Sequence, residues 1–248
     1  MINDIYTIWL REMIRFWRSK SRVIGGLAMP FFWFAIMGTG FNKLIDMGGT
    51  SYIEFLLPGI IGMTLLFSSM FSGISVLVDK QFGFMKEILV APISRLSIML
   101  GKTLGGATTA MINGIIILLL AIIIGISING FIGILVALLF MLLISSSFVS
   151  LGVAVASKMT DTSGFQLIMN FLIMPMFLLS GALFPLNQTP LWMQAIAYVN
   201  PMFYGVDGLR GALVGVSILP VAIDILVLLS FCTITVFSGT YLFRKSEV

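Results

Sequence analysis

The sequence contains no histidine and a single cysteine, Cys232. These absences exclude proton transfer by histidine, zinc sites built from histidine and cysteine, an internal disulfide bond and a Cys–His nucleophile. Charged residues are also scarce, at 10% of the chain, whereas hydrophobic residues make up 59%. One globular core cannot bury so much apolar side chain. The composition therefore excludes a soluble enzyme, a nucleic-acid-binding module and a disordered tail, and it predicts an all-α protein that spans a membrane several times.

Long uncharged stretches locate the predicted transmembrane helices, because a spanning helix needs about 20 mostly apolar residues. The stretch 103–157 is long enough for two crossings, joined by a turn near Asn129 and Gly130. The stretch 162–206 begins like a spanning helix, but its second half is too polar to face lipid. We predict six crossings, at about residues 23–42, 56–78, 104–126, 131–156, 164–184 and 218–243.

Lysine and arginine, which favour cytoplasmic loops, are divided unevenly between the two sides of these spans. Twelve of the 14 lie before the first span, between the second and third, between the fourth and fifth, or after the last. Only Lys43 and Arg210 fall on the other side. Both ends of the chain are therefore predicted to be cytoplasmic.

Residues 1–22 are predicted to form an amphipathic helix in the membrane surface rather than a cleaved signal peptide. Polar side chains recur every three or four positions and define one stripe: Asp4, Thr7, Arg11, Arg15, Arg18 and Arg22. We expect the arginines to face anionic lipid and the aromatic rings to lie at headgroup depth. The helix could act as a topology anchor or could also transmit movement to the first span, and the sequence leaves both open.

The predicted loop between the second and third spans is the most informative segment. A short helix over about residues 80–92 would carry an apolar ridge beside charged residues and would end at a proline. The ridge is Phe84, Ile88 and Leu89, the charges are Lys86 and Glu87, and the proline is Pro92. Such a helix suits docking into a groove of another protein. The alternative is an interfacial helix that rests on lipid.

Two blocks of sequence resemble one known family. QFGFMKEILVAPISR, at residues 81–95, closely resembles the coupling-helix region of type-2 ABC exporter permeases. SGALFPL at 180–186, YVNP at 198–201 and YGVDGLR at 204–210 are similar to the C-terminal signature of that family. The resemblance covers nearly the whole chain and is strongest to the drug-resistance branch, typified by daunorubicin export permeases. The chain departs from the family at Gln81 and Phe82, where members often carry an acidic or basic pair.

The resemblance implies a permease subunit that moves an amphipathic, drug-like or lipid-linked substrate out of a prokaryotic cell. Two copies of a separate ABC ATPase subunit, which hold ATP and magnesium, would drive a homodimer or heterodimer of permeases. The resemblance assigns contacts with the ATPase to Gly83, Phe84, Lys86, Glu87, Ile88, Leu89, Pro92 and Arg95.

The resemblance also implies a re-entrant extracellular hairpin before the last span, at about residues 185–206, which would line the outer end of the substrate path. Its gate and signature residues would be Phe184, Pro185, Asn200, Pro201, Tyr204, Gly205, Asp207 and Arg210. The polarity of residues 184–204 supports a hairpin independently, because non-helical backbone at membrane depth requires cover from protein or water. A conventional extracellular loop is the alternative.

The chain contains no complete phosphate-binding loop. Gly101, Lys102 and Thr103 resemble the end of one, but Leu96 stands where its first glycine should be. We therefore expect no enzyme activity, no metal site and no cofactor in this chain, and ATP hydrolysis would need a partner. Membrane lipid is an expected partner and nucleic acid is not.

An ion-coupled secondary transporter is the alternative function. That class needs ionisable groups within the membrane and broken helices in repeated halves. We expect no charge deep in a span except Asp224, which could lie at the outer interface or in the permeation path, and no convincing repeat is present. The remaining polar features are weaker signals. They are the Gly-x-x-x-Gly spacings at 101–105 and 211–215, and Asn113, Gln166 and Asn170, which could bond between helices or contact substrate.

Overall fold

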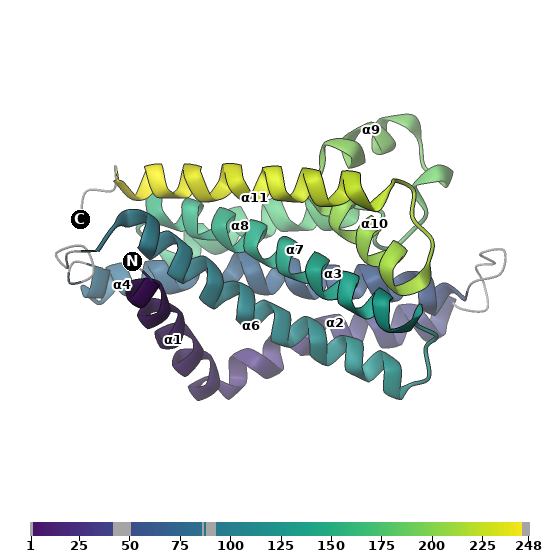
Figure 1. Cartoon of the computed structure of the whole chain (residues 1–248), viewed down its shortest axis with the longest axis horizontal. Coiled ribbons are helices and arrows are strands. Elements are labelled where there is room, and N and C mark those ends of the chain that lie inside the picture. Colours follow the sequence, from purple (N-terminus) through teal and green to yellow (C-terminus); the bar gives the residue numbers. More distant parts are fainter. Residues whose placement is uncertain (1, 42–50, 86, 88–92, 245–248) are drawn as a thin grey trace.

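The computed structural model describes residues 2–41, 51–85, 87 and 93–244, and this part of the chain is helical and contains no strand (Figure 1). The prediction of an all-α protein is confirmed. The helices are α1 (Ile2–Arg18), α2 (Lys20–Phe41), α3 (Tyr52–Phe71), α4 (Ile74–Gln81), α6 (Arg95–Ile123), α7 (Gly130–Lys158), α8 (Thr162–Leu178), the 3-10 turn η1 (Leu186–Gln188), α9 (Leu191–Val199), α10 (Pro201–Val214) and α11 (Val221–Arg244).

Five stretches of the described chain are long and apolar enough to cross a membrane: α2, α3 together with α4, α6, α7 and α11. A further helix, α8, is apolar but only 17 residues long. The chain is therefore a membrane protein with several spanning helices. The count of six crossings stays a prediction.

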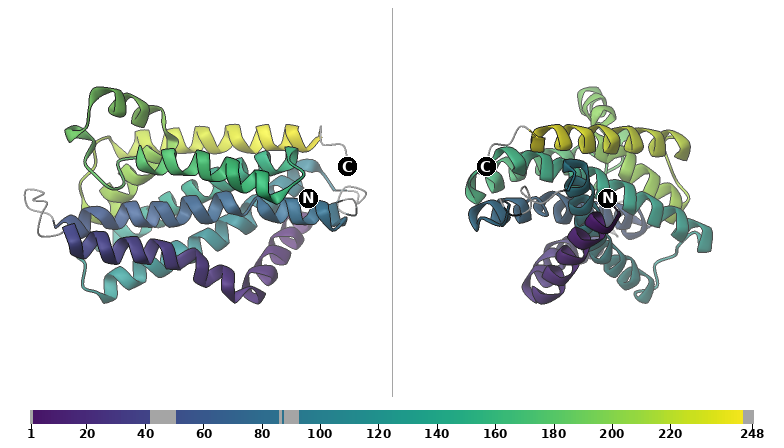
Figure 2. Two further views of the ribbon diagram at one scale, coloured as in Figure 1. Left: turned by 180° about the vertical axis from the view of Figure 1, so that it is seen from behind. Right: turned by 60° about the vertical axis from the view of Figure 1, so that its left-hand side comes forward.

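The long helices lie side by side, with α7 in contact with α3, α6, α10 and α11 (Figure 1). At one end of the bundle lie the start of α1, α4 and the end of α11, whereas α9 and α10 lie at the other. Helix α1 runs obliquely to the long helices before the chain turns back into α2 (Figure 2). The two groups of residues that the sequence singles out therefore lie at opposite ends of the molecule.

Helix α3 is the most enclosed of the long helices, because it is apolar on every side and packs in the middle of the core. Leu56, Ile60 and Leu65 have no exposed surface. Gly59 lets α3 approach the backbone of Ala182, since a Cβ atom at Gly59 would overlap that carbonyl group. Helix α3 therefore touches the segment that follows α8.

Polar side chains fix where several helices begin. Ser51 and Glu54 form a reciprocal capping box at the start of α3. Ser94 accepts a hydrogen bond from the backbone N–H group of Ser97 at the start of α6, and Asp161 caps α8 in the same way. These caps separate the helices from the loops that join them.

The segment expected as a single second span over 56–78 is broken at Ser72 and Gly73, which divide α3 from α4. A Cβ atom at Gly73 would lie 2.5 Å from the carbonyl oxygen of Gly152 on α7, so the missing side chain permits a close backbone approach at the break. Helix α4 then runs to Gln81, so residues 80 and 81 belong to α4 and not to the expected coupling helix.

Two other helices differ in extent from the predicted segments. The helix expected over 164–184 ends at Leu178, and Gly181 follows in the left-handed region with a φ of 72°. The expected hairpin over 185–206 contains α9 and α10, of which α10 continues to Val214. Helix α10 ends there because Gly215 adopts a left-handed conformation that closes the helix.

Candidate functional site

Five charged side chains from three helices meet at the end of the bundle that carries α1 and α4. Asp79 on α4 accepts hydrogen bonds from Nη2 of Arg11 at 2.6 Å and from Nη2 of Arg15 at 2.9 Å, both on α1. Nζ of Lys102 on α6 donates to Oδ2 of Asp79 at 2.6 Å and to Oε1 of Glu12 at 2.7 Å. We call these five residues the charge cluster.

The charge cluster is largely hidden from solvent. The side chains of Asp79 and Lys102 are 0% and 1% exposed, and that of Glu12 is 10% exposed. Burying a charge costs several kcal/mol, so such groups are stable inside a protein only when they pair and form hydrogen bonds. Burial alone would lower the pKa of Arg15, but the hydrogen bond and negative charge of Asp79 raise it above the ordinary value. The cluster therefore joins α1, α4 and α6 through ion pairs.

The expectation that the arginines of the first helix face anionic lipid is wrong for Arg11 and Arg15, because both point to Asp79. Asp79 and Lys102 are buried within the protein just outside the predicted spans, so the expectation that only Asp224 lies near the depth of a span stays a prediction. The sequence hid these pairs because Asp79 lies 68 positions from Arg11.

Helix α4 is also held on its other side. Nζ of Lys80 donates hydrogen bonds to the backbone carbonyl groups of Ser157 and Met159, at the end of α7. Asp79 and Lys80 therefore tie α4 to three other helices, α1, α6 and the end of α7, from adjacent positions. A displacement of α4 would therefore strain its contacts with all of these helices.

Two glycines let α1 lie directly on α6. A Cβ atom at Gly101 would lie 2.7 Å from Cβ of Ile8, and one at Gly105 would lie 2.7 Å from Cβ of Glu12. This Gly-x-x-x-Gly spacing therefore serves close helix approach. The second such spacing does not, because Gly215 terminates α10.

The predicted coupling segment, which runs from Gly83 to Arg95 and contains the residues assigned to contact with the ATPase, begins directly beside the charge cluster. The guanidinium carbon of Arg11 lies 5.7 Å from the ring centroid of Phe84, within the range of a cation–π contact. Glu87 is exposed, whereas Gly83 and Arg95 are half-buried. Four other predicted coupling residues lie outside the described residues: Lys86, Ile88, Leu89 and Pro92. Arg11 therefore links the described part of the coupling segment to the charge cluster.

The predicted gate residues lie at the opposite end, around α10. Oδ1 of Asn200 accepts a hydrogen bond from the backbone of Met202 at 3.0 Å and so caps α10, while its Nδ2 donates to the carbonyl of Met176 at 2.6 Å. The hydroxyl of Tyr204 donates to the carbonyl of Tyr198 at 2.7 Å. These bonds hold α9 and α10 against each other and against α8. Phe184, Pro185, Pro201 and Tyr204 are half-buried, and Asn200 and Gly205 are buried.

Asp207 anchors the loop that follows α10, and Arg210 anchors the segment that follows α8. The carboxylate of Asp207 accepts hydrogen bonds from the backbone N–H groups of residues 218 and 219 at 2.9 and 2.8 Å. Nη2 of Arg210 donates to the carbonyl of Gly181 at 2.9 Å, and its guanidinium carbon lies 3.9 Å from the ring centroid of Phe55 on α3. Both side chains are buried, so they position the loops rather than face open solvent.

Of the other polar side chains near the predicted spans, Asp224 and Asn113 are buried, and Gln166 and Asn170 are exposed. Asp224 is buried in the first turn of α11, and its carboxylate accepts no hydrogen bond from the described residues. Asn113 on α6 donates to Ser68 on α3, which is the expected bond between helices. Gln166 and Asn170 are exposed on α8.

Comparison with known proteins identifies the family. The sequence profile described as ABC-2 type transporter matches residues 3–214. The chain belongs to the ABC-2 type transporter family. A putative transport permease, ycf38, of Cyanophora paradoxa is 27% identical over 213 residues, which cover 84% of this chain and 73% of that protein.

Two bacterial proteins align over more of the chain. Nodulation protein J of Rhizobium leguminosarum bv. viciae is 26% identical over 243 residues, which cover 96% of this chain and 93% of that protein. Inner membrane transport permease YadH of Escherichia coli (strain K12) is 25% identical over 229 residues, with coverages of 91% and 88%.

The protein is thus an ABC-2 transport permease, a kind of membrane subunit that normally works with an ATPase. The charge cluster, the coupling segment and α10 all lie within the residues that match the family. The closeness to the daunorubicin branch stays a prediction.

Proposed function

We propose that this ABC-2 permease is the membrane subunit of an ATP-driven exporter and that a separate ATPase docks on its coupling segment. Six spans would place both ends of the chain in the cytoplasm of a prokaryotic cell, with the α9–α10 hairpin re-entering from outside. Two ATPase copies, which hold ATP and magnesium, would serve two permease copies, identical or different.

The observation that carries this proposal is the position of Arg11 between Phe84 and Asp79. Nη2 of Arg11 lies 2.6 Å from Oδ1 of Asp79, and its guanidinium lies against the Phe84 ring. A force on the coupling segment would reach α1 through Arg11 and would reach α6 through Lys102. Such a connection would transmit movement into the bundle when a partner subunit displaces the cytoplasmic side of the permease.

Helix α3 offers a route from this end to the hairpin. It leads through the break at residues 72 and 73 into α4, which carries Asp79, and its other end carries Phe55 beside Arg210. ATP binding would close the two ATPase copies, move α4 and α3, and shift the loop that Arg210 holds at Gly181. The opening between the two permease copies would change as a result.

Exposed apolar side chains support contact with lipid and with a second permease. Helix α8 is apolar, and its side chains are nevertheless not covered by the rest of the chain: Leu167 is 72% exposed and Phe171 is 84% exposed. A surface of this kind requires lipid or another protein as cover. We propose an amphipathic, drug-like or lipid-linked substrate for the same membrane environment.

Co-purification tests the proposal. The full chain is purified from its native membrane in nanodiscs, and the proteins that accompany it are identified by mass spectrometry. We expect a stoichiometric partner of soluble composition with a glycine-rich phosphate-binding loop, and ATPase activity that depends on the permease. A preparation without an ATPase, repeated after crosslinking, would contradict the proposal.

Asp224 favours the second candidate, an ion-coupled secondary transporter, because a buried carboxylate that accepts no hydrogen bond from the described part of the chain suits an ion site. Transport in proteoliposomes that contain the permease alone separates the two. Uptake driven by an ion gradient, lost in Asp224→Asn, would support the second candidate. ATP-dependent transport that Asp224→Asn leaves intact would support the exporter.

A further inference from the structure

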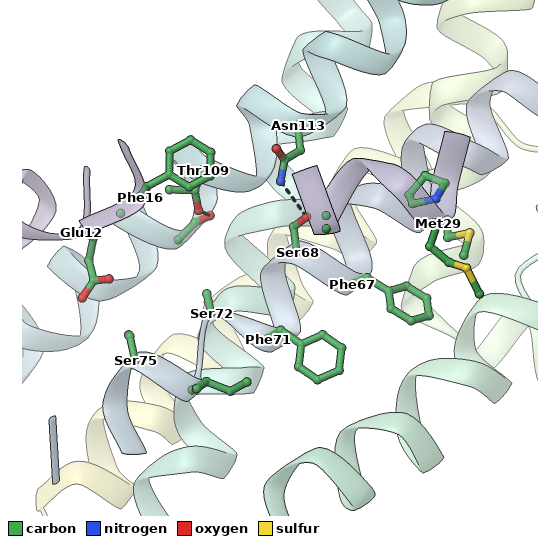
Figure 3. Close-up of a pocket in the computed structure, with 17 residues that line it drawn as sticks. Glu12, Phe16, Met29, Phe67, Ser68, Phe71, Ser72, Ser75, Thr109 and Asn113 are labelled. Carbon is green, nitrogen blue, oxygen red and sulfur yellow. Dashed lines mark hydrogen bonds between the residues drawn. The ribbon is translucent and has the colours of Figure 1, made fainter. Parts of the chain in front are cut away.

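A cavity of about 410 Å³ lies between α1, α2, α3, α4 and α6 and borders the charge cluster at Glu12 (Figure 3). Its size falls within the roughly 300–1,000 Å³ of pockets that bind small organic molecules, near the lower end. It therefore has room for one single-chain molecule. Because α2 forms one wall, the cavity borders a helix whose spanning window is mostly unburied within this chain.

The polar lining groups run from one end of the cavity to its middle, and the other end is apolar. Glu12 and Ser75 lie at one end in Figure 3, whereas Met29 and Phe67 lie toward the other, with Asn113 and Ser68 between them. Phe16, Pro30, Met63 and Phe71 add to the apolar lining. An occupant that matches this lining has an apolar chain and a compact polar head.

Asn113 supplies an unused polar group in the wall. The residue is 3% exposed, its Nδ2 donates to Oγ of Ser68 at 3.1 Å, and its Oδ1 has no hydrogen-bond partner among the described residues. A buried amide oxygen without a partner costs about 1–3 kcal/mol. A ligand that brings a hydrogen-bond donor would remove that cost.

Neighbouring hydroxyl groups also offer acceptors. Ser72 donates its hydrogen to the carbonyl of Ser69 at 2.6 Å, and Thr109 donates to the carbonyl of Gly106 at 2.8 Å. Each hydroxyl has one hydrogen, so both oxygens remain free to accept from a ligand. The polar groups of the wall therefore match a head that carries hydroxyl groups.

The charges beside the cavity disfavour a charged head of either sign. Among the described side chains that line the cavity, Glu12 is the charged one, and its carboxylate repels an anion and is already paired with Lys102. Both carboxylates of the charge cluster are already paired with its three cations, so the cluster leaves no unpaired carboxylate as a counter-ion for a cationic head. A neutral head fits better than an ammonium or phosphate group.

We propose that this cavity binds one neutral, single-chain amphiphile whose head carries hydroxyl groups, with its chain between α2 and α3. The inference rests on the proposed function only in naming that molecule as the class of substrate that enters the permease. Binding itself requires no ATPase. It occurs at the end of the bundle where α1 and the charge cluster lie.

Two glycines of α2 provide a matched pair of variants. A Cβ atom at Gly25 or at Gly40 would meet no atom within 4 Å, but only Gly25 lines the cavity. Gly25→Trp therefore places a large ring at the cavity without a clash at its root. Gly40→Trp places the same ring on the same helix away from the cavity.

The experiment uses the full chain in nanodiscs and a monoacylglycerol that carries a photoreactive diazirine in its chain. Matched probes carry the same chain with both hydroxyls methylated, with a trimethylammonium head, or with a phosphate head. Labelled peptides are identified by mass spectrometry. We expect labelling on α2 and α3, about tenfold stronger with the free hydroxyls than with the methylated head, and weaker still with either charged head.

Gly25→Trp should reduce labelling by the monoacylglycerol about tenfold, while Gly40→Trp should leave it unchanged. Asn113→Leu keeps a similar side-chain volume. In this variant the ratio of labelling by the free-hydroxyl probe to labelling by the methylated probe should fall toward one. The comparison of heads on the unmodified protein stands even where a variant fails to fold.

Equal labelling by the free and methylated heads, a preference for a charged head, or full labelling of Gly25→Trp would each overturn the inference. The outcomes are separable from those of the proposed function. Selective labelling without ATP-dependent transport would contradict the exporter and leave the cavity assignment intact. ATP-dependent transport without selective labelling would contradict the cavity assignment and leave the exporter proposal intact.

Discussion

Lys102 on α6 and Asp79 on α4 form an ion pair of 2.6 Å, with both side chains almost completely hidden. The pair connects α6 to α4, the short helix that precedes the predicted coupling segment. A buried pair of this kind contributes little net stability over an apolar pair, but loss of one partner leaves an uncompensated charge. Its place in the fold therefore gives the coupling segment a defined connection to the bundle.

We expect Lys102→Met to destabilise the permease by about 3 kcal/mol, because Glu12 and Asp79 would lose their shared cation. The loss is measured as a lower midpoint of thermal unfolding in nanodiscs. Lys158→Met is the matched control, since Lys158 is exposed at the end of α7. Equal midpoints for the two variants would show that the buried pair does not matter to the fold.

We expect Arg11→Ala to weaken coupling more than stability, because Asp79 keeps two cationic partners while Phe84 loses its contact. The amount of ATP hydrolysed per molecule exported should rise several-fold in the complex with the ATPase. Arg18→Ala, at an exposed position of the same helix, should change neither quantity. A normal ratio in Arg11→Ala would remove Arg11 from the coupling route.

The exposed Glu87 offers a second test of coupling. Glu87→Arg reverses a charge in the predicted docking segment, and we expect it to lower the ATPase activity that depends on the permease while membrane insertion stays intact. Leu89→Asp should act in the same way, and Glu87→Asp, which keeps the charge, should retain most activity. Unchanged transport in both Glu87→Arg and Leu89→Asp would count against the docking role.

We expect Gly101→Leu to destabilise the protein by about 1–3 kcal/mol, because the new side chain would overlap Ile8 on α1. Gly40→Leu introduces the same side chain where a Cβ atom meets no neighbour, so its unfolding midpoint should not fall. A smaller loss for Gly101→Leu than for Gly40→Leu would mean that α1 does not lie on α6 as described.

Arg210→Lys tests the anchor at the hairpin. Lysine lacks the planar guanidinium that lies 3.9 Å from the Phe55 ring centroid, and a single ammonium cannot reproduce both this contact and the bond to Gly181. We expect a loss of about 1–2 kcal/mol. Arg18→Lys, at an exposed position, should be neutral, and equal behaviour of the two would contradict the anchor.

Local patterns in the sequence sufficed to predict the all-helical architecture, because apolar stretches and polar interruptions lie in the same short windows as the helices that they specify. The break between α3 and α4 could not be predicted in this way. It involves the approach of Gly73 to Gly152, 79 positions away, and the stretch around it carries no charge that would mark an interruption.

The charge cluster was missed for a related reason. Arg11, Arg15 and Lys102 each look like an ordinary cytoplasmic cation, and Asp79 looks like a loop residue at the end of a span. Only the folded chain brings them to one point. The spacing of Gly101 and Gly105 was a usable signal for the packing of α1 on α6, but the same spacing at Gly211 and Gly215 reflects a helix end.

Site-specific photocrosslinking at position 87 tests the central claim most directly. A photoreactive amino acid replaces Glu87 in the full chain, and in a control it replaces Trp192, which is 59% exposed on α9 at the opposite end of the bundle. Crosslinked partners are identified by mass spectrometry from native membranes. We expect position 87 to capture a soluble ATPase with a phosphate-binding loop and position 192 to capture none. Capture of lipid alone at position 87, or of the ATPase equally at both positions, would contradict the claim.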